Sequence, residues 1–412
     1  MPDMIDYQEA RRLVLAAAKP LPVELIPLAE ALGRTLGSDI RTREDIPPFA
    51  KAAMDGYAVR AEDTRAAEAG SVELAVTEDL AAGRTARRAV APGRAARIMT
   101  GAPLPRGADA VVMVEDTEKS GDDGKVKIGR EVRPGDNIGL AGEDVRKGEL
   151  VLERGKILGP ADIGMLAALG RPRVPVVRRP KLAVISTGDE IVEPGEKPAR
   201  GQIRNSNGWA LSALALSAGA EAFYLGIARD KGSSLRSKIR RAEGADILVL
   251  SGGVSVGDYD LVKDELRTLG VRPVFWGVRI KPGKPVFFGR RGKLLVFGLP
   301  GNPTSAMVTF HLFVRPAVER MLGREKTGPP AGRAVLASDL VLKPGRTQFL
   351  RGLLEGEGPV CRVNAFSDQR SGVLRSMVHG RVLIVVPADV SRLERGTEVE
   401  ILFLEGESPW PS

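Results

Sequence analysis

The sequence predicts a multidomain α/β protein organised around a doubly wound α/β domain at residues 179–327. Within that range short apolar runs alternate with helical patterns, as in a largely parallel sheet covered by helices on both faces. Short β runs separated by glycine and proline precede this domain, and the chain is β-rich again after Pro330. A chain of 412 residues is also too long for a single hydrophobic core. We therefore expect separate β domains on either side of the α/β domain.

The N-terminal part predicts a discontinuous helical lobe with a β domain inserted into it. Residues 1–45 contain helical pieces broken by prolines, and Asp6 is placed to cap the first of them. Residues 144–178 return through a helix that ends at Gly170. We expect these two segments to form the lobe and residues 46–143 to form the inserted β domain. Its expected strands are Val72 to Val76, Ala95 to Met99, Ala110 to Val114 and Lys125 to Ile128.

Five polar clusters follow expected strands of the α/β domain. Open α/β sheets bind their ligands at the edge where the carboxyl ends of parallel strands meet. The clusters are Ser186-Thr-Gly-Asp-Glu190, Arg229-Asp230, Ser251 to Asp260, Lys281-Pro-Gly-Lys284 and Gly298 to Ser305. The fourth cluster follows an expected strand from Val274 to Ile280. Because all five occupy the same position relative to their strands, we expect a binding site at this edge.

The most informative stretch is a buried apolar strand, Asp246 to Leu250, followed by a glycine-rich turn and a helix. Such a unit presents backbone N–H groups and a helix N-terminus to an anion. Asp258 and Asp260 in the same turn favour a metal ion or a cationic partner beside that anion. Lys281 and Lys284, held by two prolines and a glycine, add cations. We expect groups that bind anions and groups that bind cations to converge here.

Residues 330–412 predict a separate small β domain or barrel. Its polar residues belong to no motif that singles them out. They include Arg346, Arg351, Gln369, Ser371 and Ser376.

Composition excludes several classes of protein. The net charge of +9 comes from 61 basic and 52 acidic residues that are interleaved, and aromatic residues are only 4%, so we expect no nucleic-acid partner. No apolar run reaches 18 residues, so we expect no membrane span. One cysteine, Cys361, excludes internal disulfides and suits the reducing cytoplasm. Two histidines exclude a histidine-rich metal site, which leaves hard metals on carboxylates.

One rival motif matches the nucleophile elbow of a serine hydrolase. Gly253-Val-Ser255-Val-Gly257 has the G-x-S-x-G spacing between a strand and a helix. A hydrolase also needs a histidine, but His311 falls inside an expected helix and His379 in the expected C-terminal domain. Ser255 is therefore better placed to donate its hydroxyl to an oxyanion. The sequence contains neither G-x-x-x-x-G-K-[ST] nor G-x-G-x-x-G.

Eight motifs in order resemble the molybdopterin molybdotransferase (molybdenum insertase) family, which includes the E domain of gephyrin. The resemblance is dense from about residue 23 to residue 323 and looser in the C-terminal domain. The family usually has a serine where this sequence has Ala52-Ala53. The motifs are Ala53-Met-Asp-Gly-Tyr-Ala58, Thr100-Gly-Ala-Pro-Leu-Pro105, Gly107-Ala-Asp-Ala-Val-Val112, Gly142-Glu-Asp144, Ser186-Thr-Gly-Asp-Glu190, Ser251-Gly-Gly-Val-Ser-Val-Gly257, Lys281-Pro-Gly-Lys-Pro285 and Leu299-Pro-Gly-Asn-Pro303.

The resemblance implies a four-domain subunit that dimerises. Its members take adenylylated molybdopterin and molybdate, hydrolyse the adenylate with a divalent metal, and release molybdenum cofactor and AMP. The α/β domain would bind the pterin, and the partner's β domain would complete the cleft. Asp55, Thr100 and Asp144 would then reach the site from the other subunit. The resemblance also implies a cytoplasmic enzyme, a molybdopterin-adenylylating enzyme upstream and molybdoenzymes as acceptors.

The expected site residues fall into four groups by role. The catalytic residues are Asp55, Thr100, Asp144, Glu190, Asp230 and Asp260. The residues for molybdate or phosphate are Ser255, Lys281, Lys284, Ser305, Arg346 and Ser371. The pterin-binding loops contain Thr187, Gly188, Gly252, Gly253, Pro300, Gly301 and Pro303. Mg²⁺ or another divalent ion would bind Asp189, Glu190, Asp230 and Asp260, since carboxylates are its preferred ligands.

Two alternatives of other kinds remain open at this point. One is a related pterin-binding enzyme that adenylylates molybdopterin, against which the extra domains argue. The other is a non-catalytic scaffold similar to gephyrin, against which the absence of long linkers argues. The sequence does not distinguish molybdate from tungstate.

Overall fold

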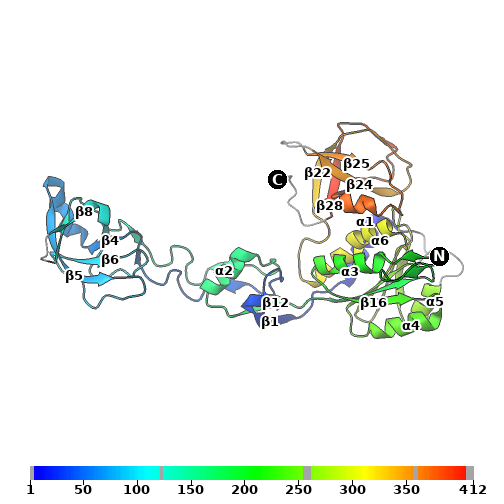
Figure 1. The fold of residues 1–412 in the computed structure, drawn as a ribbon, viewed down its shortest axis with the longest axis horizontal. Coiled ribbons are helices and arrows are strands. Elements are labelled where there is room, and N and C mark those ends of the chain that lie inside the picture. The colour runs from blue at the N-terminus through cyan, green and yellow to red at the C-terminus, as the bar shows by residue number, and fades with distance from the viewer. Residues whose placement is uncertain (1–3, 121–123, 254–260, 356–360, 405–412) are drawn as a thin grey trace. The chain divides into compact units, whose positions relative to one another are not determined.

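The computed structural model describes residues 4–120, 124–253, 261–355 and 361–404, which fold into two compact units (Figure 1). The first unit takes its residues from the ranges 1–37, 155–158 and 175–412. The second unit takes its residues from 38–154 and 159–174.

A six-stranded sheet lies at the centre of the first unit, in the order β16-β13-β17-β21-β20-β18. β16, β13, β17 and β21 are parallel, and β20 is antiparallel to both of its neighbours. The strands are β13 (Lys181–Thr187), β16 (Glu221–Ala228), β17 (Ile247–Ser251), β18 (Arg272–Trp276), β20 (Phe287–Arg291) and β21 (Leu294–Leu299). The antiparallel strand β20 was missing from the sequence prediction.

Helices cover both faces of this sheet because alternate strand residues point in opposite directions. Leu182 and Val184 of β13 join one hydrophobic cluster, and Ala183 and Ile185 join another. Helices α4 and α5 pack on the second cluster, and the other helices pack on the first. The helices are α1 (Tyr7–Ala17), α3 (Asn207–Ser217), α4 (Gly232–Arg241), α5 (Leu261–Thr268), α6 (Pro303–Thr309), η4 (Phe310–Val314) and α7 (Arg315–Met321). The doubly wound prediction is therefore confirmed.

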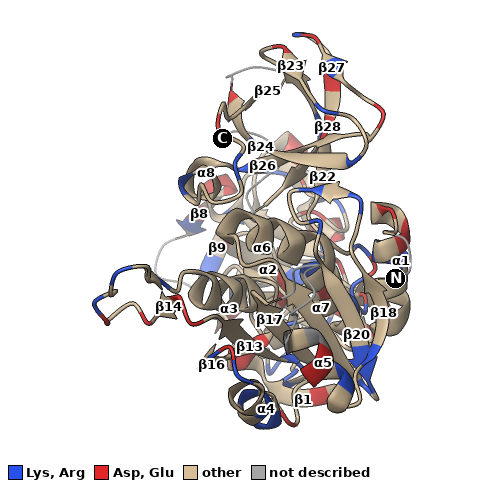
Figure 2. Cartoon of the chain, turned by 90° about the vertical axis from the view of Figure 1, so that its right-hand side faces the viewer, with Lys and Arg blue, Asp and Glu red and all other residues tan. Residues whose placement is uncertain are grey.

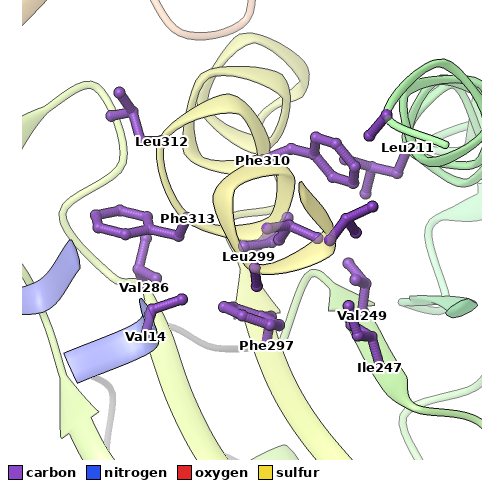
Figure 3. Close-up of a cluster of buried hydrophobic side chains, with 14 of the residues drawn as sticks. Val14, Leu211, Ile247, Val249, Val286, Phe297, Leu299, Phe310, Leu312 and Phe313 are labelled. Carbon is purple, nitrogen blue, oxygen red and sulfur yellow. The ribbon is translucent and has the colours of Figure 1, made fainter. Parts of the chain in front are cut away.

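The first hydrophobic cluster joins the N-terminal helix to the sheet (Figure 3). Val14 of α1, Leu211 of α3 and Phe313 of η4 lie around Phe297 and Leu299 of β21. The Asp6 carboxylate caps α1 as expected, because it accepts a hydrogen bond from the Glu9 N–H at 2.8 Å. α1 thus packs in the core beside the sheet, whereas the sequence analysis placed residues 1–45 in a separate lobe. The division into four domains stays a prediction.

The C-terminal strands form a closed five-stranded barrel, which confirms the predicted barrel-like domain. The strands follow the order β24-β25-β22-β28-β26, and β26 pairs back to β24. β19 adds a parallel pairing with the first two residues of β24. The elements are β19 (Ile280–Lys281), β22 (Ala331–Leu336), β24 (Thr347–Glu355), β25 (Arg362–Ala365), β26 (Val382–Val386), β28 (Glu398–Phe403) and helix α8 (Arg375–His379). Cys361 is buried in the barrel core.

The expected strand from Val274 to Ile280 is divided in the structure. β18 ends at Trp276, and Ile280 and Lys281 pair with Thr347 and Gln348 of the barrel. A continuous apolar run predicted one strand, but its second half has a different pairing partner.

The second unit contains another six-stranded sheet, in the order β7-β4-β6-β5-β9-β8. All four β runs expected in this region are present. Gly56 begins β4, where a Cβ atom would lie 1.9 Å from the Val112 carbonyl oxygen, so only glycine fits. The elements are β4 (Gly56–Val59), β5 (Val72–Leu80), β6 (Arg94–Ile98), β7 (Ala110–Met113), β8 (Thr117–Ser120), β9 (Lys125–Ile128) and helix α2 (Pro160–Ala168).

Short elements complete the described part of the chain. Five two-stranded pairs are β1 (Val23–Pro27) with β12 (Arg173–Val177), β3 (Lys51–Ala52) with β10 (Ile138–Gly139), β2 (Ile40–Arg41) with β11 (Leu150–Leu152), β14 (Ile191–Val192) with β15 (Ile203–Arg204), and β23 (Leu340–Val341) with β27 (Arg392–Leu393). Three short helical turns are η1 (Leu28–Glu30), η2 (Ala61–Ala69) and η3 (Val114–Asp116).

Basic and acidic residues are interspersed over the described chain (Figure 2). The densest basic run lies on α4, where Arg236 pairs with Glu265 and the Lys238 ammonium donates to the Leu225 carbonyl. Part of this basic run is therefore engaged within the protein. Among the described residues no helix is long and apolar enough to cross a membrane.

The π-helical turn η4 buries His311, which is 3% exposed. Among the described residues its Nδ1 has no hydrogen-bond partner. Burial, together with the nearby charge of Arg315, lowers the pKa of His311 to about 3. The imidazole is therefore neutral in the folded protein at all but strongly acidic pH.

His311→Leu is expected to make the fold less sensitive to acid. The unfolded chain protonates this histidine below its ordinary pKa of 6.5, whereas the folded chain does so only near pH 3. Protonation of this histidine therefore costs the folded protein nothing above pH 6.5. Below that pH it lowers the free energy of unfolding increasingly as the pH falls toward 3, by about 2 kcal/mol at pH 5. Urea unfolding at pH 7.5 and pH 5 measures this, with the exposed His379→Leu as control. An equal pH dependence in wild type and His311→Leu would contradict the expectation.

Candidate active site

The ends of the parallel strands bring the glycine-bearing loops together. Ser186 of β13 lies beside Ser251 of β17, which lies beside Leu299 of β21. The Thr187 hydroxyl donates to the Ser251 carbonyl at 3.3 Å, and the Gly252 N–H donates to the Leu299 carbonyl at 3.1 Å. The loops that follow β13, β17 and β21 therefore meet at one edge of the sheet.

These loops approach each other at distances that only glycine allows. A Cβ atom at Gly252 would lie 2.7 Å from the Thr187 carbonyl oxygen, and one at Gly253 would lie 2.5 Å from the Val262 side chain. Both glycines have positive φ, +92° and +64°. Gly301 lies next to Gly252, since a Cβ atom added to Gly301 would lie 3.6 Å from the Gly252 Cα. The glycines therefore allow the three loops to pack closely against one another at the strand ends.

Asn207, the first residue of α3, connects two of the loops. Its side-chain N–H₂ group donates to the Ser251 hydroxyl at 2.9 Å and to the Gly301 carbonyl at 2.7 Å. Asn207 is not among the site residues predicted from the sequence. An asparagine at the start of a helix that begins near the same sheet edge was the available signal.

Two of the expected metal-binding carboxylates lie on adjacent loops. The Asp189 N–H donates to the Asp230 carboxylate at 3.4 Å, and the Asp230 N–H donates to the Asp189 carboxylate at 3.2 Å. Arg229 fixes the first loop because its guanidinium donates to the Asp189 and Ile191 carbonyls. Glu190 folds back against Gly188, where an added Cβ would lie 2.3 Å from its carboxylate. The reciprocal bonds hold two negative charges near one another at the sheet edge.

The acidic pair has the chemistry of a site for a hard divalent cation. Mg²⁺ binds proteins through one or two carboxylates and completes its shell with water and substrate phosphates. Among the described residues no group of three or more acidic, histidine or cysteine side chains gathers around one point. Asp260 and Ser255, both expected in the site, lie outside the described residues. Asp189 and Asp230 fit a cation that also takes ligands from a bound phosphate.

The two expected lysines lie on the turn that connects β18 to β20. The Gly277 N–H donates to the Val286 carbonyl, and the Val278 N–H donates to the Lys284 carbonyl. Gly283 packs on α6, because an added Cβ would lie 2.3 Å from the Thr309 methyl group. Lys281 and Lys284 themselves are exposed. β18 runs in the same direction as β21, so this turn lies at the same sheet edge as the glycine loops.

A loop of the barrel covers the N-terminus of α6. The Ser371 carbonyl accepts from the Thr304 N–H at 3.1 Å, and the Thr304 hydroxyl donates to the Val373 carbonyl at 3.2 Å. Pro303 is the first residue of this helix, and Ser305 in its first turn is buried. α6 thus contacts the Ser371 loop at its start and the lysine turn at its end.

Arg351 of β24 holds the barrel loop in place from inside the protein. Its side chain is 0% exposed. The guanidinium donates to the Ser376 hydroxyl and to the carbonyls of Asp368, Gln369 and Arg370, at 3.0 to 3.1 Å. The sequence analysis found nothing to distinguish Arg351, Gln369 or Ser376. Arg346, which it placed in the site, is half-buried and directly precedes β24.

The three site residues expected from a partner subunit, Asp55, Thr100 and Asp144, all lie in the second unit. The Asp55 carboxylate accepts from both the N–H and the hydroxyl of Thr100, each at 2.7 Å. These two hydrogen bonds lower the pKa of Asp55, which is exposed. Asp144 lies on another turn, where its N–H donates to the Ile46 carbonyl. Asp55 and Thr100 therefore form one preorganised group. The described contacts of Asp144 do not connect Asp144 to this group.

Known proteins resemble the chain over nearly its whole length. Residues 5–170 match the MoeA N-terminal region (domain I and II), residues 183–320 a probable molybdopterin binding domain, and residues 333–404 the MoeA C-terminal region (domain IV). Molybdopterin molybdenumtransferase 2 of Mycobacterium tuberculosis is 38% identical over 97% of this chain and 99% of its own length. The chain belongs to the molybdopterin molybdenumtransferase family.

Other members of the molybdopterin molybdenumtransferase family agree with this assignment. The Bacillus subtilis molybdopterin molybdenumtransferase is 35% identical over 99% of this chain and 96% of its own length. The crystal structure of a molybdopterin biosynthesis moea protein from Pyrococcus horikosii is 37% identical, with a TM-score of 0.87 over 98% of this chain and 100% of that one. The predicted resemblance, the fold class and the transferase activity are thereby confirmed.

Proposed function

We propose that this transferase hydrolyses adenylylated molybdopterin and inserts molybdenum from molybdate into the pterin dithiolene, with release of AMP. Molybdopterin and molybdenum follow from the names of the relatives. One observation supports the site: α6 contacts the lysine turn at one end and the Ser371 loop at the other, beside the glycine-rich strand ends. These contacts support an anion site at this sheet edge, where α/β proteins bind their ligands.

The chain's own residues divide the work of binding. The loops at Thr187, Gly252 and Gly301 offer close backbone approach to the pterin and its phosphate. Molybdate is a tetrahedral dianion, and Lys281 and Lys284 are exposed ammonium groups on a turn fixed to α6. Hydroxyl donors complete the proposed oxyanion site at Ser305, Ser371 and Ser255, with Arg346 as a further cation.

A divalent cation, Mg²⁺ or another, is proposed to bind Asp189 and Asp230, with Glu190 and Asp260 as further carboxylates. Such a cation offsets charge on the leaving phosphate and orients the attacking water. The reciprocal hydrogen bonds between Asp189 and Asp230 hold both carboxylates ready for this purpose.

The direct test of the function is AMP release from adenylylated molybdopterin, measured with and without molybdate. Tungstate in a parallel reaction determines which oxyanion is preferred. ATP-dependent adenylylation of molybdopterin in place of AMP release would instead identify an adenylylating enzyme. Binding of both ligands without any turnover would indicate the scaffold alternative.

Lys281→Ala and Lys284→Ala are each expected to weaken molybdate binding about tenfold or more, because a charge-assisted hydrogen bond contributes about 1.5–3 kcal/mol. Calorimetric titration with molybdate measures this effect. Lys293→Ala, which removes an exposed lysine before β21, is the matched control. Unchanged molybdate affinity in both lysine variants would exclude this turn from the oxyanion site.

The second unit is proposed to act on the site of a partner subunit in a homodimer. Asp55 and Thr100 are exposed and preorganised. In such a dimer each site takes Asp230 from one chain and Asp55 from the other. Asp55→Asn and Asp230→Asn therefore damage the same site from different chains. Mixing the two inactive variants should then restore about a quarter of wild-type AMP release, since half the dimers are mixed and carry one intact site of two. No recovery after verified subunit exchange would mean that each chain completes its own site.

A cytoplasmic location is part of the same proposal, as are an adenylylating enzyme that supplies the substrate and molybdoenzymes that receive the product. These follow from the family and from the reaction, and co-purification with such partners tests them.

A further inference from the structure

The barrel loop that carries Ser371 also carries an oriented guanidinium group. Arg370, next to Ser371, donates from Nε and Nη2 to the Asp368 carboxylate at 2.6 to 3.1 Å. The side chain of Arg370 is 83% exposed. Among the described residues its Nη1 has no hydrogen-bond partner. Two of its three nitrogens are therefore engaged within the loop, and the third is left to bind a ligand.

The backbone beneath Arg370 is held on both sides. The Arg370 carbonyl accepts from the buried Arg351 guanidinium at 3.1 Å, and its N–H donates to the Asp368 carboxylate at 3.0 Å. One residue later, the Ser371 carbonyl accepts from the Thr304 N–H at the start of α6. An exposed arginine usually samples many rotamers, and that lost freedom reduces what it contributes to binding. Here Arg351 and α6 hold the backbone, and the ion pair with Asp368 favours one direction of the Arg370 side chain before any ligand arrives.

We propose that Arg370 is a specificity-determining residue whose Nη1 hydrogen-bonds a tetrahedral oxyanion, molybdate or the phosphoryl group of adenylylated molybdopterin, at the rim of the site beside Ser371. This inference rests on the proposed function and adds a residue to it. Asp368 offsets most of the charge of Arg370, so the contribution is a directed short-range hydrogen bond rather than a long-range field. The carboxylate orients the guanidinium as an outer ligand orients a metal-binding histidine.

A purely structural role is the alternative. Asp368 closes a tight turn with the Arg370 N–H, and an exposed ion pair between close neighbours contributes little to stability. In that case the loss of Arg370 would leave the affinity for anions unchanged. The two roles are therefore separated by binding rather than by stability.

The test compares Arg370→Ala and Arg370→Lys with Arg333→Ala by calorimetric titration with molybdate and, separately, with inorganic phosphate. Arg333 is the matched control because it is also an exposed barrel arginine paired with a carboxylate, that of Glu398. Arg370→Ala should raise the Kd of one of the two anions about fivefold. The anion affected shows whether Arg370 binds molybdate or the phosphoryl group of the substrate. Arg370→Lys should recover little, because an ammonium lacks the planar fork that pairs with Asp368. Arg333→Ala should change neither Kd.

Several results would overturn the proposal. Unchanged affinity for both anions in Arg370→Ala, with weakened binding in Lys284→Ala, would refute the role of Arg370 and leave the proposed function intact. Full recovery in Arg370→Lys would refute the oriented guanidinium. If the wild-type protein binds neither anion and releases no AMP, the proposed function itself is wrong.

Discussion

Asp230→Asn is expected to lower the rate of AMP release by about 100-fold or more while adenylylated molybdopterin still binds. Asparagine keeps a side-chain oxygen that accepts from the Asp189 N–H, so the reciprocal contact between the two loops survives. The substitution removes one of the two negative charges that would hold a divalent cation. An anionic substrate meets less repulsion in the variant, so its affinity should stay equal or rise.

The measurement separates binding from chemistry. Single-turnover AMP release and substrate affinity are determined on the same preparation, and Mn²⁺ binding is followed by electron paramagnetic resonance. Asp264→Asn, which changes an exposed carboxylate on α5, is the control. Normal AMP release, or a loss of substrate binding with no further loss of turnover, would show that Asp230 has no part in holding a cation.

Arg351→Met is expected to reduce the free energy of unfolding by about 3–5 kcal/mol, because it removes four hydrogen bonds of a buried guanidinium and leaves partly buried loop carbonyls without their donor. Methionine fills a similar volume but donates no hydrogen bond, so the Ser376 hydroxyl and three loop carbonyls lose their donor. The same change should weaken molybdate binding, since the Ser371 loop would no longer be held against α6.

Urea unfolding and molybdate titration together test this expectation. Arg362→Met on β25 is the matched control, because Arg362 is an exposed arginine of the same barrel. Arg351→Lys retains the charge with fewer donors, so its free energy of unfolding should lie between those of wild type and Arg351→Met. This variant keeps the test usable if Arg351→Met does not fold. A loss of less than about 1 kcal/mol would mean that the loop keeps its position without the guanidinium.

The sequence predicted the parts of the fold that depend on local patterns. β13, β17 and β21 are apolar runs buried on both faces, and each ends in a polar loop. Their existence and their positions along the chain could therefore be predicted. The glycines at 252 and 253 were recognisable because a tight turn after a buried strand needs positive φ. The family motifs lie at the same places, which is why both the sequence pattern and the resemblance predict a site at this edge.

The parts that sequence missed depend on partners distant in the chain. The run from Val274 to Ile280 looks like one strand, but Ile280 pairs with Thr347 of the barrel. The burial of Arg351 is predictable only if the carbonyls of residues 368–370 are known to surround it. Asn207 is one polar residue among many until the carbonyl of Gly301 is placed beside it. In each case the missing information was a tertiary contact.

The pairing of β19 with β24 has a consequence for the protein during its synthesis. Ile280 and Lys281 leave the ribosome before Thr347 and Gln348, so the lysine turn lacks its neighbouring strand until the barrel follows. Helix α1 likewise lacks a packing partner until β24 is made, because the ring centroid of Tyr7 lies 5.0 Å from that of Phe349. Helix α1 and the turn with the lysines both have partners on β24, which follows them in the chain. A nascent chain that already contains the whole α/β sheet therefore still lacks the strand that pairs with the lysine turn, so the proposed oxyanion site would be completed only after the barrel is made.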